Sequence, residues 1–74
     1  MGETTLTHSF GEEVRRLRRE RGLSQEDFAD ECGLHRTYVG AVERGEKTVT
    51  IETANKIVKA LGLSLADFFR QIGR

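Results

Sequence analysis

The sequence predicts an all-α fold, in the form of a compact domain of five short helices. Apolar residues recur along the chain with the spacing of helices, and glycines end the periodic stretches. No segment alternates apolar and polar residues for long enough to predict a sheet. The 74 residues allow a single domain, because chains this short bury only about 60% of their unfolded surface.

The ends of the expected helices follow from local signals. Glycines that favour a left-handed C-terminal cap stand after four periodic stretches, at Gly22, Gly33, Gly45 and Gly62. Three serines precede an acidic residue by three positions, the spacing of a capping box, at Ser9, Ser24 and Ser64, and Thr50 offers a further N-cap. We therefore expect helices at about residues 10–21, 25–32, 36–44 and 51–61, followed by a short fifth helix.

Each expected helix carries an apolar stripe that faces one shared core. In chain order the stripes are Phe10, Val14 and Leu17; Phe28, Ala29 and Cys32; Val39 and Val42; Ile51, Ala54, Ile57, Val58 and Leu61; and Leu65, Phe68, Phe69 and Ile72. We expect the domain to span residues 9–74 and residues 1–8 to form a flexible N-terminal arm.

The composition excludes several classes of protein. The single cysteine, Cys32, cannot form an internal disulfide, and with His8 and His35 it offers no recognisable metal-ligand spacing. No apolar run approaches the roughly 20 residues of a membrane span, and no signal-peptide core follows Met1. No nucleophile–base pair or paired acids stand at a recognisable spacing. We expect a small cytoplasmic protein with no catalytic activity, metal or cofactor.

Residues 24–45 have the pattern of a helix-turn-helix. Only two or three residues around Gly33 separate two expected helices, so these helices must cross steeply, and the small Ala29 lies four residues before the turn. Val39 and Val42 direct the second helix back onto the core. In this motif the second helix fits the major groove of DNA. The pattern therefore predicts a DNA-binding domain.

The outer face of this second helix carries the residues expected to read bases. They are Arg36, Thr37, Tyr38, Gly40 and Ala41. Arg36 lies in the first turn, where the helix dipole disfavours a cation, and this local cost makes sense if its guanidinium reads guanine. Gly40 and Ala41 lower the middle of the face, so that backbone approaches the bases. The structural alternatives are a solvated Arg36, a Gly40 without a role and a Tyr38 that packs half-buried.

A second set of residues is expected to contact DNA phosphates, which sets the register of the protein without specifying sequence. The set is Ser24, Gln25, His35, Arg44, Lys47 and Thr48. Gln25 opens a helix, where free backbone N–H groups favour a phosphate. His35 is a poor N-cap, so either the next helix begins less firmly or a protonated His35 reaches a phosphate. An exposed turn residue is the structural alternative for His35.

The sequence resembles the Cro/phage-repressor (Xre) family of helix-turn-helix transcription regulators over two runs, LSQEDFADECGLHRTYVGAVERG and TIETANKIVKALGLSLADFF. The resemblance covers nearly everything from Phe10 to Phe69, and RTYVGAVERG is similar to the small controller proteins of restriction–modification systems. It implies a lambda-repressor-like domain that acts as a homodimer on a pseudo-palindromic operator. It also implies that Gln25 binds a phosphate and that Arg18 and Glu43 pair across the core.

The fifth helix is expected to form the dimer interface. Its apolar residues fall at i, i+3, i+4 and i+7, and a four-helix core can hardly cover all of them. Leu65, Phe69 and Ile72 form the outward set, and the alternative is that they close the core of a monomer. A dimer is also expected because one short helix reads few bases, and paired half-sites lie about 34 Å apart.

Two other classes of function compete with a bacterial or phage-encoded DNA-binding regulator that works with RNA polymerase. An antitoxin would bind its own operator with the same domain and neutralise a partner toxin. A helical interaction module would show no salt-dependent affinity for DNA. The net charge of zero, from 12 basic and 12 acidic residues, does not exclude DNA binding. It predicts weak non-specific affinity and reliance on two correctly spaced half-sites.

Overall fold

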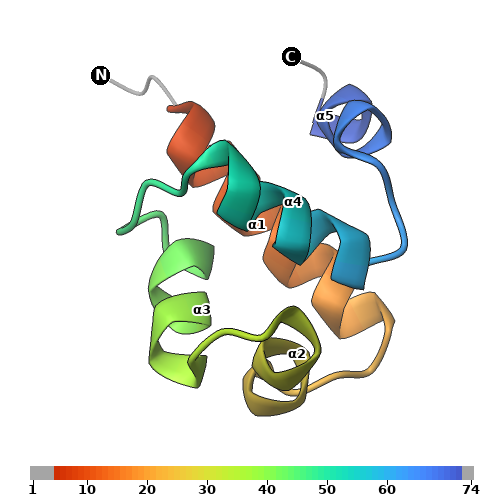
Figure 1. Cartoon of the computed structure of the whole chain (residues 1–74). Helices are drawn as coiled ribbons and strands as arrows, with labels where there is room; N and C mark the ends of the chain where they lie inside the picture. The colour runs from red at the N-terminus through yellow and green to blue at the C-terminus, as the bar shows by residue number, and fades with distance from the viewer. Residues whose placement is uncertain (1–4, 73–74) are drawn as a thin grey trace.

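The computed structural model describes residues 5–72, and every regular element among them is an α-helix (Figure 1). The helices are α1 (Leu6–Glu20), α2 (Gln25–Cys32), α3 (Arg36–Glu43), α4 (Ile51–Ala60) and α5 (Leu65–Ile72). Helix α3 packs on α1 and α2, while α5 packs on α4 and α1 at the other end of the molecule. The predicted all-α fold of five helices is confirmed.

Helix α1 begins earlier than the sequence predicts. Its N-cap is Thr5, whose hydroxyl accepts a hydrogen bond from the backbone N–H of His8 at 3.1 Å. Ser9, the expected cap, lies inside the helix. The additional turn packs onto the end of α3, where a Cβ at Gly45 would come within 3.0 Å of His8 Nδ1. Leu6 to His8 therefore belong to α1, with Thr5 as its cap, and not to a flexible arm. Residues 1–4 of the expected arm lie outside the described residues.

The other predicted helix ends are confirmed. The hydroxyls of Ser24, Thr50 and Ser64 each accept from the backbone N–H three residues further on, at 3.0, 3.1 and 3.1 Å. All four glycines expected to end helices have positive φ. The value of 71° at Gly33 lets α2 stop and α3 start three residues later. The local signals of the sequence thus place α3 relative to α2.

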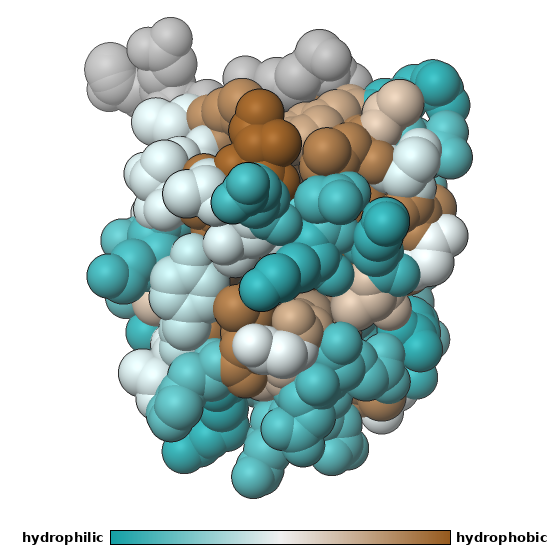
Figure 2. Space-filling view, in the orientation of Figure 1, coloured by the Kyte–Doolittle hydropathy of each residue, from teal (hydrophilic) through white to brown (hydrophobic). Residues whose placement is uncertain are grey.

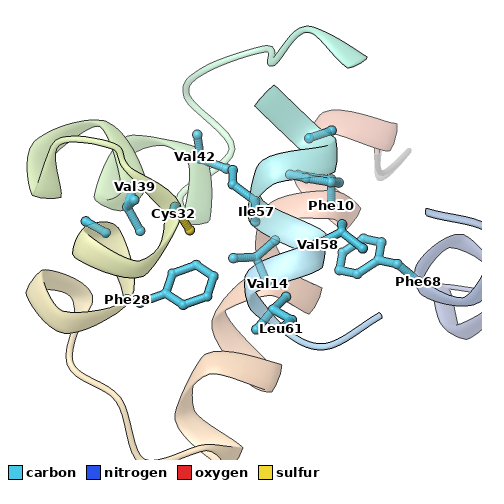
Figure 3. Close-up of a cluster of buried hydrophobic side chains, with 12 residues drawn as sticks. Phe10, Val14, Phe28, Cys32, Val39, Val42, Ile57, Val58, Leu61 and Phe68 are labelled. Atoms are coloured by element: carbon cyan, nitrogen blue, oxygen red, sulfur yellow. The ribbon is translucent and has the colours of Figure 1, made fainter. Parts of the chain in front are cut away.

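All five helices contribute to one hydrophobic core (Figure 3). Its buried members are Phe10, Val14, Phe28, Ala29, Cys32, Val39, Val42, Ala54, Ile57, Val58, Leu61 and Phe68. Phe68 is fully buried, and its ring centroid lies 5.1 Å from that of Phe10. Ile51 was expected in the stripe of α4, but it is 78% exposed. That prediction is wrong because the first turn of α4 lies at the rim of the core, where no other helix covers the Ile51 side chain.

A glycine allows α1 and α3 to approach closely. A Cβ at Gly11 would lie 2.1 Å from the carbonyl oxygen of Val42 and 3.0 Å from that of Glu43. No side chain fits in this space, so the last turn of α3 rests directly on the backbone of α1. The contact fixes the position of α3 against the core, which matters because α3 carries the candidate site.

Candidate nucleic-acid interface

Helix α3 presents its first two residues to solvent while its opposite side is fixed in the core. Val39 and Val42 are each 1% exposed, whereas Arg36 and Thr37 are exposed. The Arg36 and Thr37 side chains have no hydrogen-bond or ion-pair partner among the described residues. Tyr38 is half-buried and packs against the core. The amino end of α3 therefore offers a free guanidinium and a free hydroxyl on a rigid support.

The sequence predicts that Gly40 lies on an open face of α3, but the structure places it under other side chains. It is buried, and a Cβ there would lie 3.2 Å from Nη1 of Arg44 and 3.5 Å from Oε1 of Gln25. These two side chains, one from the start of α2 and one from the end of α3, cover the Gly40 backbone. The expected outward position of Gly40 is thus corrected: its missing side chain makes room for two polar ones. Ala41 is half-buried.

A buried ion pair ties α3 to α1 and α2. Nε of Arg18 donates to Oε2 of Glu43 at 2.6 Å, and Nη2 donates to Oε1 at 3.0 Å. Nη1 of Arg18 donates to the carbonyl of Leu23 at 2.7 Å, and Nε2 of Gln25 donates to Oε1 of Glu43 at 3.1 Å. The two charged residues are only 8% and 5% exposed. The pair that the family resemblance implies therefore also holds the side chain of Gln25.

His35 caps α3. Its Nδ1 accepts a hydrogen bond from the backbone N–H of Thr37 at 3.2 Å, so this nitrogen carries no proton in the capped form. The ring is exposed at the amino end of the helix. His35 thus supplies the acceptor that serine or asparagine supplies at other helix starts, while the strength of this cap stays a prediction.

Arg44 forms an ion pair within the turn that follows α3. Its Nε donates to Oε2 of Glu46 at 3.0 Å, and its Nη2 donates to Oε1 at 3.1 Å. The hydrogen bonds and the charge attraction raise the pKa of Arg44 and lower the pKa of Glu46. The sequence interpretation did not single out Glu46, although its position two residues after a predicted phosphate contact was a usable signal.

The other predicted phosphate contacts, Ser24, Lys47 and Thr48, are exposed. The Ser24 hydroxyl also serves as the cap of α2. A cleft of about 600 Å³ lies beside α3, where Arg15, Arg18 and Arg19 of α1 meet Gln25 and Arg44. Arg15 and Arg19 were not predicted as site residues; the only signal was the arginine-rich run that contains them. The carboxylates of Glu12 and Glu43 and the ring of His8 also line the cleft, so it brings groups of both charges from α1, α2 and the end of α3 together.

A separate apolar groove of about 300 Å³ lies where α1, α4 and α5 meet. Figure 2 shows apolar surface gathered at this end of the molecule, at the top of the view. The groove is lined by Leu6, Phe10, Val49, Ile51, Ala54, Leu65 and Phe69, with Lys47 and Thr48 beside them. Leu6 is 52% exposed and Ile51 78% exposed.

The structure brings together two of the three residues predicted for a dimer interface. Leu65 and Phe69 are half-buried and line the apolar groove, whereas Ile72, also half-buried, lies beside a different hollow with Gln71. Sequence reasoning missed the two exposed large hydrophobic residues of this surface, because Leu6 was assigned to the arm and Ile51 to the core.

The only cysteine of the chain lies inside the core. Cys32 is 6% exposed, and burial, aided by the nearby Glu31 carboxylate, raises the pKa of its thiol to about 11. The thiol is therefore protonated at neutral pH and serves as a packing group. In residues 5–72 no cluster of three or more His, Cys, Asp or Glu side chains is arranged to hold a metal ion. Nor does any helix there have the length and apolarity needed to cross a membrane.

The sequence matches known proteins over most of its length. Residues 14–68 match the helix-turn-helix family. The control protein C.BamHI of Bacillus amyloliquefaciens is 45% identical over 67 residues, which cover 86% of this chain and 83% of that protein. The control protein C.SmaI of Serratia marcescens is 45% identical over 64 residues, which cover 86% of this chain and 76% of the relative. Neither is described as an antitoxin.

Solved structures agree with these matches. The restriction-modification controller protein C.Esp1396I, determined as a tetramer in complex with its natural 35 base-pair operator, is 33% identical with a TM-score of 0.86, over 95% of this chain and 92% of that one. The controller protein C.AhdI from Aeromonas hydrophila is 41% identical with a TM-score of 0.80, over 85% of this chain and 96% of that one. The chain therefore belongs to the Xre-type helix-turn-helix family of transcription regulators, and restriction–modification control proteins are among its relatives.

Proposed function

We propose that the chain is a sequence-specific DNA-binding transcription regulator that acts as a homodimer on a pseudo-palindromic operator, as a controller of a restriction–modification system. The observation that carries this proposal is the amino end of α3, where Arg36 and Thr37 are exposed and unpaired on a helix whose other side is buried. The relatives described as control proteins, one of them solved on its operator, support it.

The geometry of α3 suits the major groove. Its eight residues make a rod about 12 Å long, comparable with the width of the groove. Arg36 at its tip reads O6 and N7 of a guanine, and Thr37 beside it contacts a base edge through its hydroxyl or a thymine methyl through its own. Gln25, Arg44 and Lys47 contact the backbone phosphates on either side and so fix the register.

Two copies are required because one α3 contacts few base pairs. The apolar groove suits an isologous contact, in which the same surface of each copy faces the other across a two-fold axis. Ile51 and Leu6 protrude beside a hollow lined by Leu65 and Phe69, so each copy supplies both a projection and a recess. Two α3 helices related in this way read half-sites about 34 Å apart.

The proposal gives the chain no catalytic role and places it in the bacterial cytoplasm, where operator DNA lies. We also propose contact with RNA polymerase, which depends on the position of the bound dimer relative to a promoter. The position of the operator therefore decides whether the regulator activates or represses.

The proposal is tested by a mobility-shift titration with the DNA that flanks the gene, against a scrambled duplex, at two salt concentrations. We expect a preference for the flanking DNA, with log K falling linearly against log salt concentration. Arg36→Ala should weaken operator binding by about 1–3 kcal/mol and change binding to scrambled DNA little.

Lys47→Gln is the variant matched to Arg36→Ala, because it removes a proposed phosphate contact, which carries no sequence information. It should weaken binding to both duplexes by the same factor and lower the salt slope by about 0.9. Equal wild-type affinity for flanking and scrambled DNA, unaltered by Arg36→Ala, would overturn the proposal.

A further inference from the structure

The turn after α3 fixes the backbone of Glu46. Gly45 has φ of 76°, its N–H donates to the carbonyl of Val42 at 3.0 Å, and the N–H of Glu46 donates to the carbonyl of Ala41 at 2.9 Å. This is the hydrogen-bond pattern of a Schellman motif, in which a left-handed glycine ends the helix and the next residue is bonded back to it. Glu46 is therefore held just beyond α3, two residues from Arg44.

The carboxylate of Glu46 occupies the edge of Arg44 that suits a phosphate. Nε and Nη2 form the two-pronged edge of a guanidinium that binds carboxylates and phosphates bidentately. Both prongs donate to Glu46, at 3.0 and 3.1 Å, while Nη1 lies over Gly40. Each of the paired side chains is 58% exposed, so an incoming phosphate can reach this edge.

We propose that Glu46 is an internal competitor for the DNA phosphate at Arg44, and that it thereby lowers the affinity of the protein for duplex DNA of every sequence. The inference rests on the proposed function. In the free protein Glu46 satisfies the bidentate edge of Arg44, and a backbone phosphate must displace it.

The size and the sequence dependence of this effect follow from the contact. Exposed ion pairs are weak, so displacement lowers DNA affinity by about 1.4- to 5-fold. Phosphates carry no sequence information, so the factor is the same for operator and non-operator DNA. A net charge of zero already predicts weak non-specific affinity for DNA, and Glu46 lowers that affinity further at one identified contact.

The test compares Glu46→Gln with wild type on operator and scrambled duplexes, with Kd measured by fluorescence anisotropy over a range of salt concentrations. We expect both duplexes to bind about 1.4- to 5-fold more tightly, with an unchanged ratio between them and a salt slope steeper by up to about 0.9. Glu31→Gln is the matched control, since it removes the same charge and frees Arg21, whose pair with Glu31 (3.2 Å) lies beside the end of α4. It should leave both Kd values unchanged.

A double-mutant cycle separates displacement at Arg44 from general charge repulsion. In an Arg44→Gln background, Glu46→Gln should have no further effect on either Kd. A gain that persists in that background, a gain equalled by Glu31→Gln, or no gain at all overturns the inference while wild-type binding stands. A wild-type protein that binds neither duplex overturns the proposed function, and the inference with it.

Discussion

At the scale of single residues, Glu43 joins three helices through one carboxylate. It accepts two hydrogen bonds from Arg18 and one from Gln25, and no buried side-chain nitrogen or oxygen among the described residues lacks a partner. Because its hydrogen bonds join α1, α2 and α3, the Glu43 carboxylate stabilises the fold. It also positions Gln25 at the candidate DNA surface.

Removal of this charge should destabilise the protein. Glu43→Gln leaves the buried Arg18 guanidinium uncompensated, and breaking a buried pair costs about 3–5 kcal/mol. For a domain of this size 1 kcal/mol shifts Tm by about 4–8 °C, so we expect Tm to fall by at least about 12 °C in thermal unfolding followed by circular dichroism. Glu46→Gln is the control, because it breaks an exposed pair worth at most about 1 kcal/mol, and it should lower Tm by less than about 8 °C. A Glu43→Gln variant with wild-type Tm that no longer binds DNA would show that Glu43 acts at the DNA surface instead.

Some features of the buried ion pair and of the α3 surface were predictable from the sequence, and others were not. The pairing of Arg18 with Glu43 was implied by family resemblance, because residues 25 positions apart carry no local signal for each other. The additional bond from Gln25 was not predicted, since it depends on how α2 and α3 cross. Exposure of Arg36 and Thr37 was predictable from the period of α3, whereas burial of Gly40 was not, because one of its two covering side chains, Gln25, comes from α2.

At the scale of elements, two helical glycines in the chain serve different purposes. Gly11 lies against backbone carbonyls of α3, which cannot move without displacing the helix. Gly40 lies against the ends of two flexible side chains, Gln25 and Arg44. The same substitution at the two positions should therefore separate fold from site.

Gly11→Ala and Gly40→Ala form a matched pair. Gly11→Ala should lower the free energy of unfolding by about 3 kcal/mol or more, because overpacking against backbone outweighs the gain of about 1 kcal/mol in helix propensity. Gly40→Ala should retain or slightly raise stability and weaken DNA binding, since Gln25 and Arg44 must shift. Urea denaturation and mobility shift measure the two effects. A Gly11→Ala variant of wild-type stability would contradict the close approach of α1 and α3.

Helix boundaries were predictable where their signals are local. Ser24, Thr50 and Ser64 cap their helices as expected, because a hydroxyl three residues before a backbone N–H satisfies it without help from the rest of the chain. The start of α1 was mispredicted because Ser9 carries the stronger local signal, with Glu12 three residues later, whereas Thr5 is followed at that spacing by His8. The choice between them depends on packing of the first turn against the Gly45 turn, which is a tertiary contact.

At the scale of the whole molecule, the apolar groove is the surface expected to join two copies. Its exposed members, Leu6 and Ile51, were not distinguishable from core or arm residues by periodicity, which reports the face of a helix and not whether a neighbour covers it. The sequence predicted that Leu65 and Phe69 share one surface, and the structure places both in the groove. Their role in a dimer stays a prediction.

Ile51→Lys is the cleanest probe of the dimer, because a side chain that is 78% exposed contributes little to the monomer fold. Each buried isoleucine contributes about 1.5–3 kcal/mol, and the symmetric interface contains two, so dimer affinity should fall at least about 100-fold. Sedimentation at micromolar concentration should show a wild-type dimer and a variant monomer with unchanged Tm. Gln71→Lys adds the same charge at an exposed position outside the groove and should remain dimeric. A monomeric wild type would contradict the homodimer.

The freedom of Arg36 and Thr37 bears on how such a protein changes over evolutionary time. Their side chains bond to nothing else among residues 5–72, and α3 is anchored from behind by Val39, Val42 and Glu43. Under the proposed function, substitutions at the two positions would alter which bases are contacted, with little cost to folding. The same proposal implies that a lineage with this architecture would acquire a new operator by one or two replacements, and that paralogues would diverge in target while they keep an interchangeable scaffold.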